Sequence, residues 1–232
     1  MAGERLDAAA LGWHGLEGDR RLAFRRIHDR SGFPWLSASQ LPAMVLFTPH
    51  RSQAAESDLP THVRTPEGTD IPVFSEELDA EIGRRSGAPV QLTHWKHGIF
   101  DEASVSVIAL ETVDEISRLA RVTPDVRRFR PNLLVRAAKS VPFQEDAWVG
   151  GLLRFGGSDD APAVAVTMRD LRCAMLNLDP DTATPTPEMM KAVVRVHGNT
   201  AGVYGAVTRT GRLEVGQSIF LSAATSKQER RS

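Results

Sequence analysis

The alternation of apolar and polar positions predicts a chain of many short strands with a few helices. Apolar or mixed runs bounded by Gly, Pro, Ser or Asp recur along its whole length, as is typical of strands. We expect strands at 20–27, 43–47, 63–73, 90–93, 132–135, 152–155, 163–166, 174–178, 204–207 and 218–221. The 63–73 run contains the turn Pro66-Glu67-Gly68 and is predicted to be a hairpin, whereas the polar stretch 48–60 is predicted to be a loop.

Helical spacing is confined to three segments. Ser75 is a predicted cap for a helix that Gly87 would end. A second helix starts near Thr112, where apolar residues recur on one face, and a third covers 189–196 with Thr186 as its cap. Many short strands joined by Gly and Pro turns favour a barrel, because closure removes exposed sheet edges. The predicted fold class is mixed α+β, mainly β.

Composition excludes several kinds of partner. The 232 residues include 28 basic and 29 acidic ones, so the formal charge is −1 and there is no basic excess for binding nucleic acid. The first residues lack the apolar stretch of a secretory signal, and the apolar runs are far short of a membrane span. One cysteine cannot form an intrachain disulfide. We therefore expect a cytoplasmic protein with no nucleic-acid or membrane partner.

Familiar catalytic motifs are missing from the sequence. It has no Gly-x-Ser-x-Gly, no Walker loop and no Gly-x-Gly-x-x-Gly after a strand, which argues against serine hydrolase, P-loop and Rossmann enzymes. His94 and His97 are either a metal pair or solvated side chains, and the lack of a third ligand nearby favours the second. Asp179-Pro180-Asp181 is either a cation site or a turn, and we favour the turn.

Cys173, the only cysteine, is the strongest candidate for chemistry. Its soft sulfur suits a metal or a nucleophilic role, and the neighbouring Arg172 would favour the thiolate. The alternative is a buried cysteine that acts as a small hydrophobe. Upstream, Arg127, Arg128 and Arg130 are either a solvated basic face or a phosphate grip, since arginine binds phosphate in bidentate fashion.

Several of these motifs together resemble one family. Arg172-Cys173 is followed by Asp179-Pro180-Asp181-Thr182 and preceded by Phe129-Arg130-Pro131-Asn132, as in the MOSC domain family, which is named for the C-terminal domain of molybdenum cofactor sulfurases. Further matches, in family order, lie at 15–21, 143–148 and 215–219. The pattern is most similar to the branch of the mitochondrial amidoxime-reducing component and its bacterial relatives.

The resemblance implies an arrangement of domains and a cofactor. It implies a MOSC-type β-barrel with a few flanking helices at 93–222, an N-terminal β-rich partner domain at 1–92 and a flexible tail at 223–232. A molybdenum-pterin cofactor would lie between the two domains. Cys173 would be the catalytic thiolate on molybdenum, and Arg172 would lie against the cofactor. Such a soft ligand suits molybdenum held by the pterin dithiolene.

Four more residues are cofactor-binding candidates on the same ground. Arg130, Asn132 and Ser104 match positions that hold the pterin or its phosphate. Ser39 stands where the closest relatives place an arginine for the cofactor. Those relatives also begin with a strand of Tyr-Pro-Val-Lys-Ser type, and we expect this first strand either to be missing or to lie upstream of Met1.

The expected function is reduction of a small N-hydroxylated compound such as an amidoxime. No cysteine set for an iron–sulfur cluster and no flavin signature is present, so electrons would come from a separate flavoprotein or ferredoxin. One alternative is a sulfur carrier or acceptor for metal–sulfur cofactors, a role associated in the family with pyridoxal-phosphate-binding desulfurase domains, for which this chain is too short. The other is a degenerate, non-catalytic cofactor-binding module.

Overall fold

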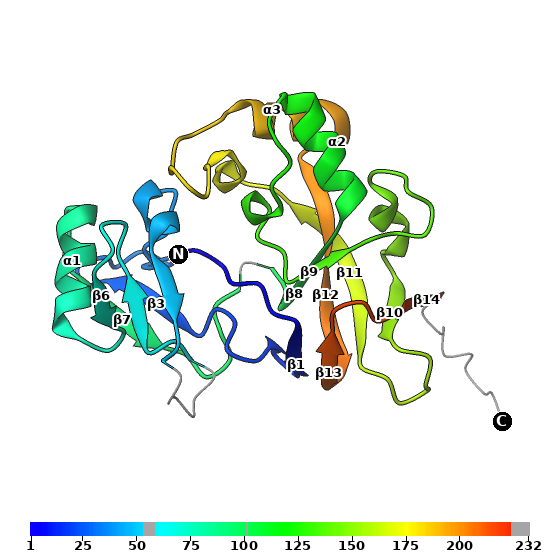
Figure 1. Cartoon of the computed structure of the whole chain (residues 1–232), viewed down its shortest axis with the longest axis horizontal. Helices are drawn as coiled ribbons and strands as arrows, with labels where there is room; N and C mark the ends of the chain where they lie inside the picture. The colour runs from blue at the N-terminus through cyan, green and yellow to red at the C-terminus, as the bar shows by residue number, and fades with distance from the viewer. Residues whose placement is uncertain (53–58, 101, 224–232) are drawn as a thin grey trace.

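A computed structural model describes residues 1–52, 59–100 and 102–223 (Figure 1). Those residues form three α-helices, four short 3-10 helices and fourteen strands. The predicted class, mixed α+β and mainly β, is therefore confirmed. Among them, no helix is both long and apolar enough to cross a membrane.

A six-stranded sheet is the centre of the C-terminal part of the chain. Its order is β14-β10-β11-β12-β8-β9, and the pairings are antiparallel except β8 with β9. These strands are β8 (Val105–Ala109), β9 (Leu133–Val135), β10 (Gly151–Phe155), β11 (Ala163–Leu171), β12 (Thr200–Arg209) and β14 (Ile219–Ala223). Register shifts between β11 and β12 increase the local twist. In the described part of the chain β9 and β14 remain edges, so the predicted barrel is a curled half-barrel.

A smaller sheet joins the two ends of the described chain. β1 (Ala8–Gly12) pairs with both β2 (Gly15–Leu16) and β13 (Gly211–Glu214), none of which we predicted. The β1–β2 turn requires glycine at position 15, where φ is +97° and a Cβ atom would lie 2.5 Å from the carbonyl oxygen of Ser104. The 15–21 motif therefore begins with a close approach of two backbones.

The N-terminal elements lie to the other side in Figure 1. β3 (Leu22–Arg26) pairs with β7 (Val90–His94), while β4 (Thr48–His50), β5 (His62–Arg64) and β6 (Asp70–Pro72) form a three-stranded sheet. The predicted 63–73 hairpin is thus confirmed as β5 and β6. Helix α1 (Glu76–Ser86) is also confirmed, since the Ser75 hydroxyl accepts a hydrogen bond from the Leu78 amide and Gly87 ends the helix in the left-handed conformation.

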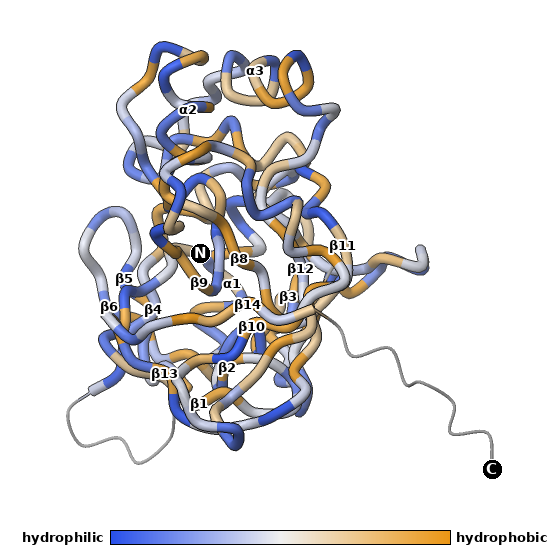
Figure 2. Tube along the Cα trace, turned by 90° about the vertical axis from the view of Figure 1, so that its right-hand side faces the viewer, coloured by the Kyte–Doolittle hydropathy of each residue, from blue (hydrophilic) through white to orange (hydrophobic). Residues whose placement is uncertain are grey.

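Apolar side chains form three clusters in the core. The first gathers residues of the N-terminal elements, including Phe47, Leu78 and Ile82, and also takes in Leu178 from far along the chain. The second gathers side chains of the large sheet together with Leu11 and Leu213 of the small one, and Figure 2 shows hydrophobic stretches along β8. The third lies between the large sheet and the helices α2 (Leu110–Ala120) and α3 (Glu188–His197). The predicted domain limits stay a prediction.

Helix α2 begins on a buried carboxylate. Glu145 is fully buried in the 3-10 helix η3 (Gln144–Trp148). Its side chain accepts hydrogen bonds from the Ala109 amide and the Thr112 hydroxyl, at the N-terminus of α2. Burial raises the pKa of the Glu145 carboxyl, and these two hydrogen bonds oppose that shift only in part. The 143–148 motif therefore supports the helix that covers one end of the sheet.

Two apolar runs predicted as strands are 3-10 helices instead. The 43–47 run forms η1 (Pro42–Leu46), because a proline at its first position has no amide proton to lose and is pre-set for a helical turn. The 174–178 run forms η4 (Ala174–Asn177). Short apolar runs fit a buried strand or a buried helical turn equally well.

Other predictions differ at element ends. The predicted 48–60 loop begins with strand β4, and residues 53–58 of it lie outside the described residues. Thr186 does not cap α3 with its side chain. The Asn177 side-chain oxygen accepts from the Met190 amide instead. Of the predicted tail, Ala223 ends β14 and residues 224–232 are outside the described part of the chain.

Candidate functional site

Cys173 lies just beyond the end of β11, one of the two longest strands in the described residues. Strand β11 stops at Leu171, and the Arg172 amide still donates to the Asn199 carbonyl across the β11–β12 pair at 2.9 Å. The following residue, Cys173, begins the turn η4. Exposure of the side chains differs along this stretch: Asp170 is buried, whereas Leu171 and Cys173 are exposed. The interpretation of Cys173 as a buried hydrophobe is therefore wrong, and its thiol is accessible.

Arg172 points into the protein beneath this turn. Its Nε donates to the Ala201 carbonyl and its Nη1 to the Phe129 carbonyl, both at 2.7 Å, and its Nη2 lies 2.8 Å from the Asp170 carboxylate. The guanidinium also stacks 5.6 Å from the centre of the Phe129 ring. Burial lowers the pKa of Arg172 and the negative Asp170 opposes that shift. Arg172 thus connects three segments of the site's frame.

Arg130 is held in a different way. Its backbone is left-handed, with φ of 51°, and its Nη1 donates to the Met1 carbonyl at 3.0 Å. The side chain is exposed to solvent, yet surrounding protein desolvates the guanidinium and the nearby Arg20 repels it, so its pKa is lowered. A cation in such a place gains from an anionic ligand, because the anion offsets both costs.

Asn132 is occupied by protein partners. Its side-chain oxygen accepts from the amide and hydroxyl of Ser106, and its Nδ2 donates to the Asp19 carboxylate at 2.8 Å. Arg20 bridges the same Asp19 and Asn132. The 15–21 motif is thereby joined to the segment that leads into β9, and Asn132 orients the chain just after Arg130.

The two predicted serines lie in separate places. Ser104 contacts the β1–β2 turn through its backbone, next to Gly15. Ser39 is exposed, and its hydroxyl lies 2.6 Å from that of Ser37 in the same loop. No contact connects Ser39 to Cys173 or Arg130 in the described residues.

The loop after Cys173 is a hydrogen-bonded turn. One carboxylate oxygen of Asp179 accepts from the amides of Asp181 and Thr182 and from the Thr182 hydroxyl. Partial burial would raise the pKa of Asp179, but these bonds and the charge of Arg128 outweigh it and lower the pKa. The predicted turn, in which the aspartate side chain bonds the backbone, is confirmed.

Two arginines bind this turn from η2 (Val126–Arg128). Arg128 donates to the Asn177 carbonyl at 3.0 Å and to the Asp179 carboxylate at 2.6 Å. Arg127 pairs with Asp125 and Asp181 nearer the surface. In sequence these arginines suggested a solvated basic face or a phosphate grip. Charge complementarity between the basic run and the acidic turn was the signal that could have predicted the pairing.

A small cavity of about 70 Å³ adjoins these arginines. It is lined by Ala2, Gly3, Val45, Arg127, Arg128, Arg130, Met175, Leu178 and Pro180. Its volume suits a small anion, because pockets for cofactors and drug-sized ligands are about 300–1,000 Å³. The lining residues come from the N-terminal part of the chain and from the segments 127–130 and 175–180, and Met175 lies two positions after Cys173.

A second cluster near the site was missed from the sequence. The Asp146 carboxylate lies 2.6 Å from His197 Nε2 at the end of α3 and 3.0 Å from Arg169 Nε on β11. Phe143 stacks on the His197 ring, with centroids 4.1 Å apart. The residues come from three distant segments, so nothing in their spacing indicated the contact.

The histidines do not form the metal pair considered from sequence. His97 lies against His14 from the β1–β2 turn, with ring centroids 3.9 Å apart. Burial, followed by the charges of His14, Lys96 and Arg21, lowers the pKa of His97. Throughout the described ranges, no three His, Cys, Asp or Glu side chains are grouped to hold a metal ion.

Comparison with known proteins places the chain in a family. Among solved structures, the YuaD protein from Bacillus subtilis is 14% identical, with 94% of this chain and 86% of that chain covered and a TM-score of 0.48. YiiM from Geobacillus stearothermophilus is 18% identical over 51% of this chain and 54% of that chain, with a TM-score of 0.40. No curated protein matches the chain.

The family model for the MOSC domain matches residues 93–220, more than half of the sequence. This region holds the large sheet, Cys173, Arg172, Arg130 and the Asp179 turn. The chain therefore belongs to the MOSC domain family.

Proposed function

We propose that this protein binds a molybdenum-pterin cofactor and reduces small N-hydroxylated compounds, as its resemblance to the amidoxime-reducing branch implies. Membership of the MOSC family supports a role related to the molybdenum cofactor. The observation that carries the proposal is the exposed thiol of Cys173, presented on a short turn whose next residues line an arginine-rich cavity.

The chemistry of the residues suits this cofactor. An exposed thiolate is a good ligand for a soft, high-valent metal, and arginine binds phosphate through paired hydrogen bonds. Cys173 would be the protein ligand to molybdenum, and Arg130 would bind the phosphate. The cavity has room for such an anionic end only, so the rest of the cofactor would lie outside it. When bound, the cofactor supplies the two-electron chemistry.

Other candidate residues would act less directly. The guanidinium of Arg172 is held by protein carbonyls, so we propose that it supports the walls beside the cofactor and adds positive charge below Cys173. Asn132 would orient Arg130 through its bonds to Ser106 and Asp19. Ser104 and Ser39 would each offer a hydroxyl to the cofactor.

The protein would take electrons from a separate donor. A flavoprotein or ferredoxin would fill this role, because the sequence has one cysteine and cannot ligate an iron–sulfur cluster of its own. We propose a cytoplasmic location and an N-terminal β-rich partner domain at 1–92 that covers the cofactor from the side opposite Cys173.

Metal analysis with a reduction assay tests the proposal. The protein is expressed with molybdate, both as the wild type and as Cys173→Ser. We expect near-stoichiometric molybdenum in the wild type and little in the variant. The loaded protein should reduce a benzamidoxime-type compound with a chemically reduced viologen as electron donor. Ser158→Ala, at an exposed serine between β10 and β11 that is not a candidate site residue, is a control that should keep its metal.

The results also separate the alternatives. A Cys173 mass increased by one sulfur atom after incubation with a polysulfide, which transfers a sulfane sulfur to the thiolate and leaves shortened by one sulfur, would favour a sulfur carrier if no molybdenum is bound. The exposed thiol suits that role as well. If neither molybdenum nor added sulfur is found, both in this 232-residue chain and in a form extended upstream of Met1, the result favours a degenerate module and contradicts the reductase.

A further inference from the structure

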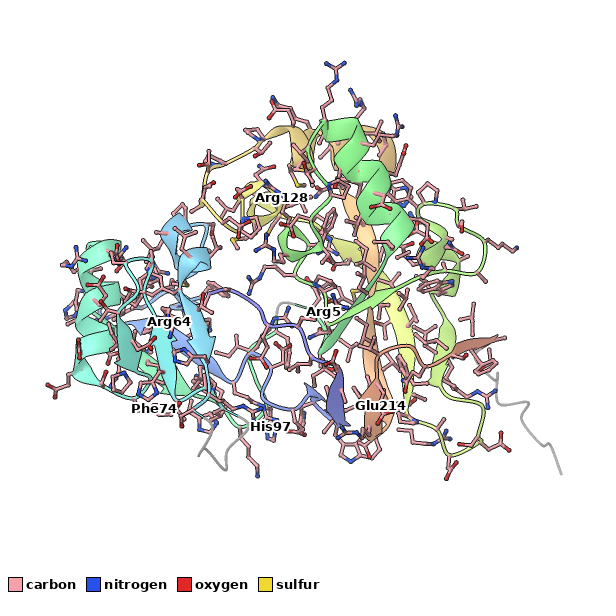
Figure 3. All side chains as sticks on the ribbon, viewed as in Figure 1. Arg5, Arg64, Phe74, His97, Arg128 and Glu214 are labelled. Carbon is pink, nitrogen blue, oxygen red and sulfur yellow. The ribbon has the colours of Figure 1, made fainter. Side chains whose placement is uncertain are left out.

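We infer that Arg128 is a positioning residue that sets the conformation of the turn carrying Cys173. Its guanidinium spans the far end of that turn: Nη1 donates to the Asn177 carbonyl and Nη2 to the Asp179 carboxylate. Figure 3 labels Arg128 beside the yellow segment that holds this turn. Among the described residues, Arg128 has the guanidinium that contacts both of these groups.

The burial of Arg128 makes these contacts strong. Only 6% of its side chain is exposed, against 30% for Asp179. Its Nε is buried without a hydrogen-bond partner, so the free-energy cost of burying the charge is offset by the two contacts at Nη1 and Nη2. Charge-assisted bonds to a buried cation are short and directional. Without Arg128, the Asn177 carbonyl would keep the Thr186 amide as a donor at 2.7 Å, whereas Oδ2 of Asp179 would lose its arginine partner.

The turn transmits this restraint to Cys173 because it is short. Helix η4 has four residues, and Cys173 is its first flanking residue. The Leu176 amide donates to the Cys173 carbonyl, and the Leu178 amide donates to the Met175 carbonyl. Fixing Asn177 therefore limits the backbone dihedrals of Cys173 within one turn. At the same residue, the Asn177 side chain accepts from the Met190 amide at the start of α3.

Arg127 provides a matched comparison from the same 3-10 helix. It also forms two acidic contacts, with Asp125 and Asp181, but 52% of its side chain and 66% of the Asp181 side chain are exposed. Exposed ion pairs add little to stability. Removing Arg127 changes the net charge as much as removing Arg128, yet it leaves the Asn177 carbonyl bonded.

The value of this positioning for chemistry rests on the proposed function, since it would aim the Cys173 sulfur at the metal. The positioning itself can be tested without cofactor, because the chain has one cysteine and that cysteine is exposed. The probes are the alkylation rate of Cys173 by iodoacetamide and the hydrogen exchange of the Leu176 amide. We compare the wild type with Arg128→Met, Arg128→Lys and Arg127→Met.

We expect the Leu176 amide to exchange about tenfold faster in Arg128→Met, because local opening no longer has to break the two contacts of Arg128 with Asn177 and Asp179. The alkylation rate should change by about threefold or more, whereas both rates in Arg127→Met should stay near the wild type. Arg128→Lys should be intermediate, since one ammonium keeps the charge but cannot span both partners. Asp179→Asn, a milder change, replaces Arg128→Met if that variant does not fold.

Unchanged Leu176 exchange and Cys173 alkylation in a folded Arg128→Met or Asp179→Asn protein would overturn the inference. Uniformly faster exchange across α2, α3 and the large sheet would also overturn it, since that result indicates general destabilisation. Molybdenum content, measured in parallel, separates the two proposals. If Leu176 exchange responds locally in Arg128→Met while the wild type binds no molybdenum, the positioning role of Arg128 stands and the proposed reductase function is contradicted.

Discussion

Gly202 tests whether the packing around Arg172 is as close as the structure describes. The residue lies on β12 with φ of +82°, beside the guanidinium beneath Cys173. A Cβ atom there would lie 2.8 Å from the Val107 carbonyl oxygen and 3.1 Å from Arg172 Nη2. The carbonyl belongs to the buried strand β8 and cannot move away cheaply. We therefore expect Gly202→Ala to destabilise the fold and to displace Arg172.

The size of the effect can be estimated in two parts. A non-glycine residue in the left-handed region costs about 1–2 kcal/mol. Overpacking in a rigid core adds about 1–3 kcal/mol. Gly87→Ala isolates the first part, because Gly87 has φ of +74° and no atom within 4 Å of its would-be Cβ. Gly202→Ala should thus lower the free energy of unfolding by about 2–5 kcal/mol, and Gly87→Ala by about 1–2 kcal/mol.

Urea unfolding, followed by tryptophan fluorescence and circular dichroism, measures both variants. With a slope of about 3 kcal/mol/M, the midpoint for Gly202→Ala should fall by about 1 M. Cys173 alkylation, measured without urea, should change in Gly202→Ala and stay constant in Gly87→Ala, since Gly87 is at the end of α1. Equal midpoints for the two variants would refute the argument, because the steric contribution at Gly202 would then be absent.

Three further changes test other parts of the structure. Burial raises the pKa of Glu145 above its ordinary 4.5, so the stability that its neutral form contributes is present below pH 4.5 and is lost as the pH rises through the raised pKa. Between pH 4.5 and 8, the free energy of unfolding should therefore fall more steeply in the wild type than in Glu145→Gln. Equal slopes would contradict this. Ser75→Ala removes the cap of α1 and should cost about 1 kcal/mol in urea unfolding, whereas Ser75→Asp should restore most of it. Asp146→Ala leaves His197 and Arg169 without their shared carboxylate and should cost about 2 kcal/mol, while Asp159→Ala, at a fully exposed carboxylate, should leave the melting temperature unchanged.

The sequence predicted elements best where local chemistry determines them. Ser75 and Gly87 set the ends of α1 through a cap and a left-handed glycine, and both signals depend on neighbouring residues only. The 174–178 run was mistaken for a strand because its apolar residues do not distinguish a strand from a buried turn. Its actual conformation depends on Arg128, a residue about fifty positions away. β1 was missed for the same reason, since its partner β13 is far along the chain.

In the candidate site too, some residues could be predicted from the sequence and others depend on distant contacts. Cys173 was identified from its type and its family motif, and its exposure supports that choice. The partners of Arg172 were not predictable, because the Ala201 and Phe129 carbonyls are backbone groups that every residue has. The Asp146–His197–Arg169 cluster depends on the packing of η3 against α3 and β11, which no local pattern encodes.

The pairing of β1 with β13 has a consequence for how the protein is made. Leu11 lies opposite Gly211, so about two hundred residues must be synthesised before β1 can find its partner. Contacts of such long range form slowly, and unpaired strand edges invite association in the meantime. During translation the segment from Ala8 to Leu16 would therefore lack its partner strand β13, and Leu11, which is buried in the folded protein, would stay exposed to solvent until most of the MOSC domain has been synthesised. Pairing of β1 with β13 is therefore a late event in folding.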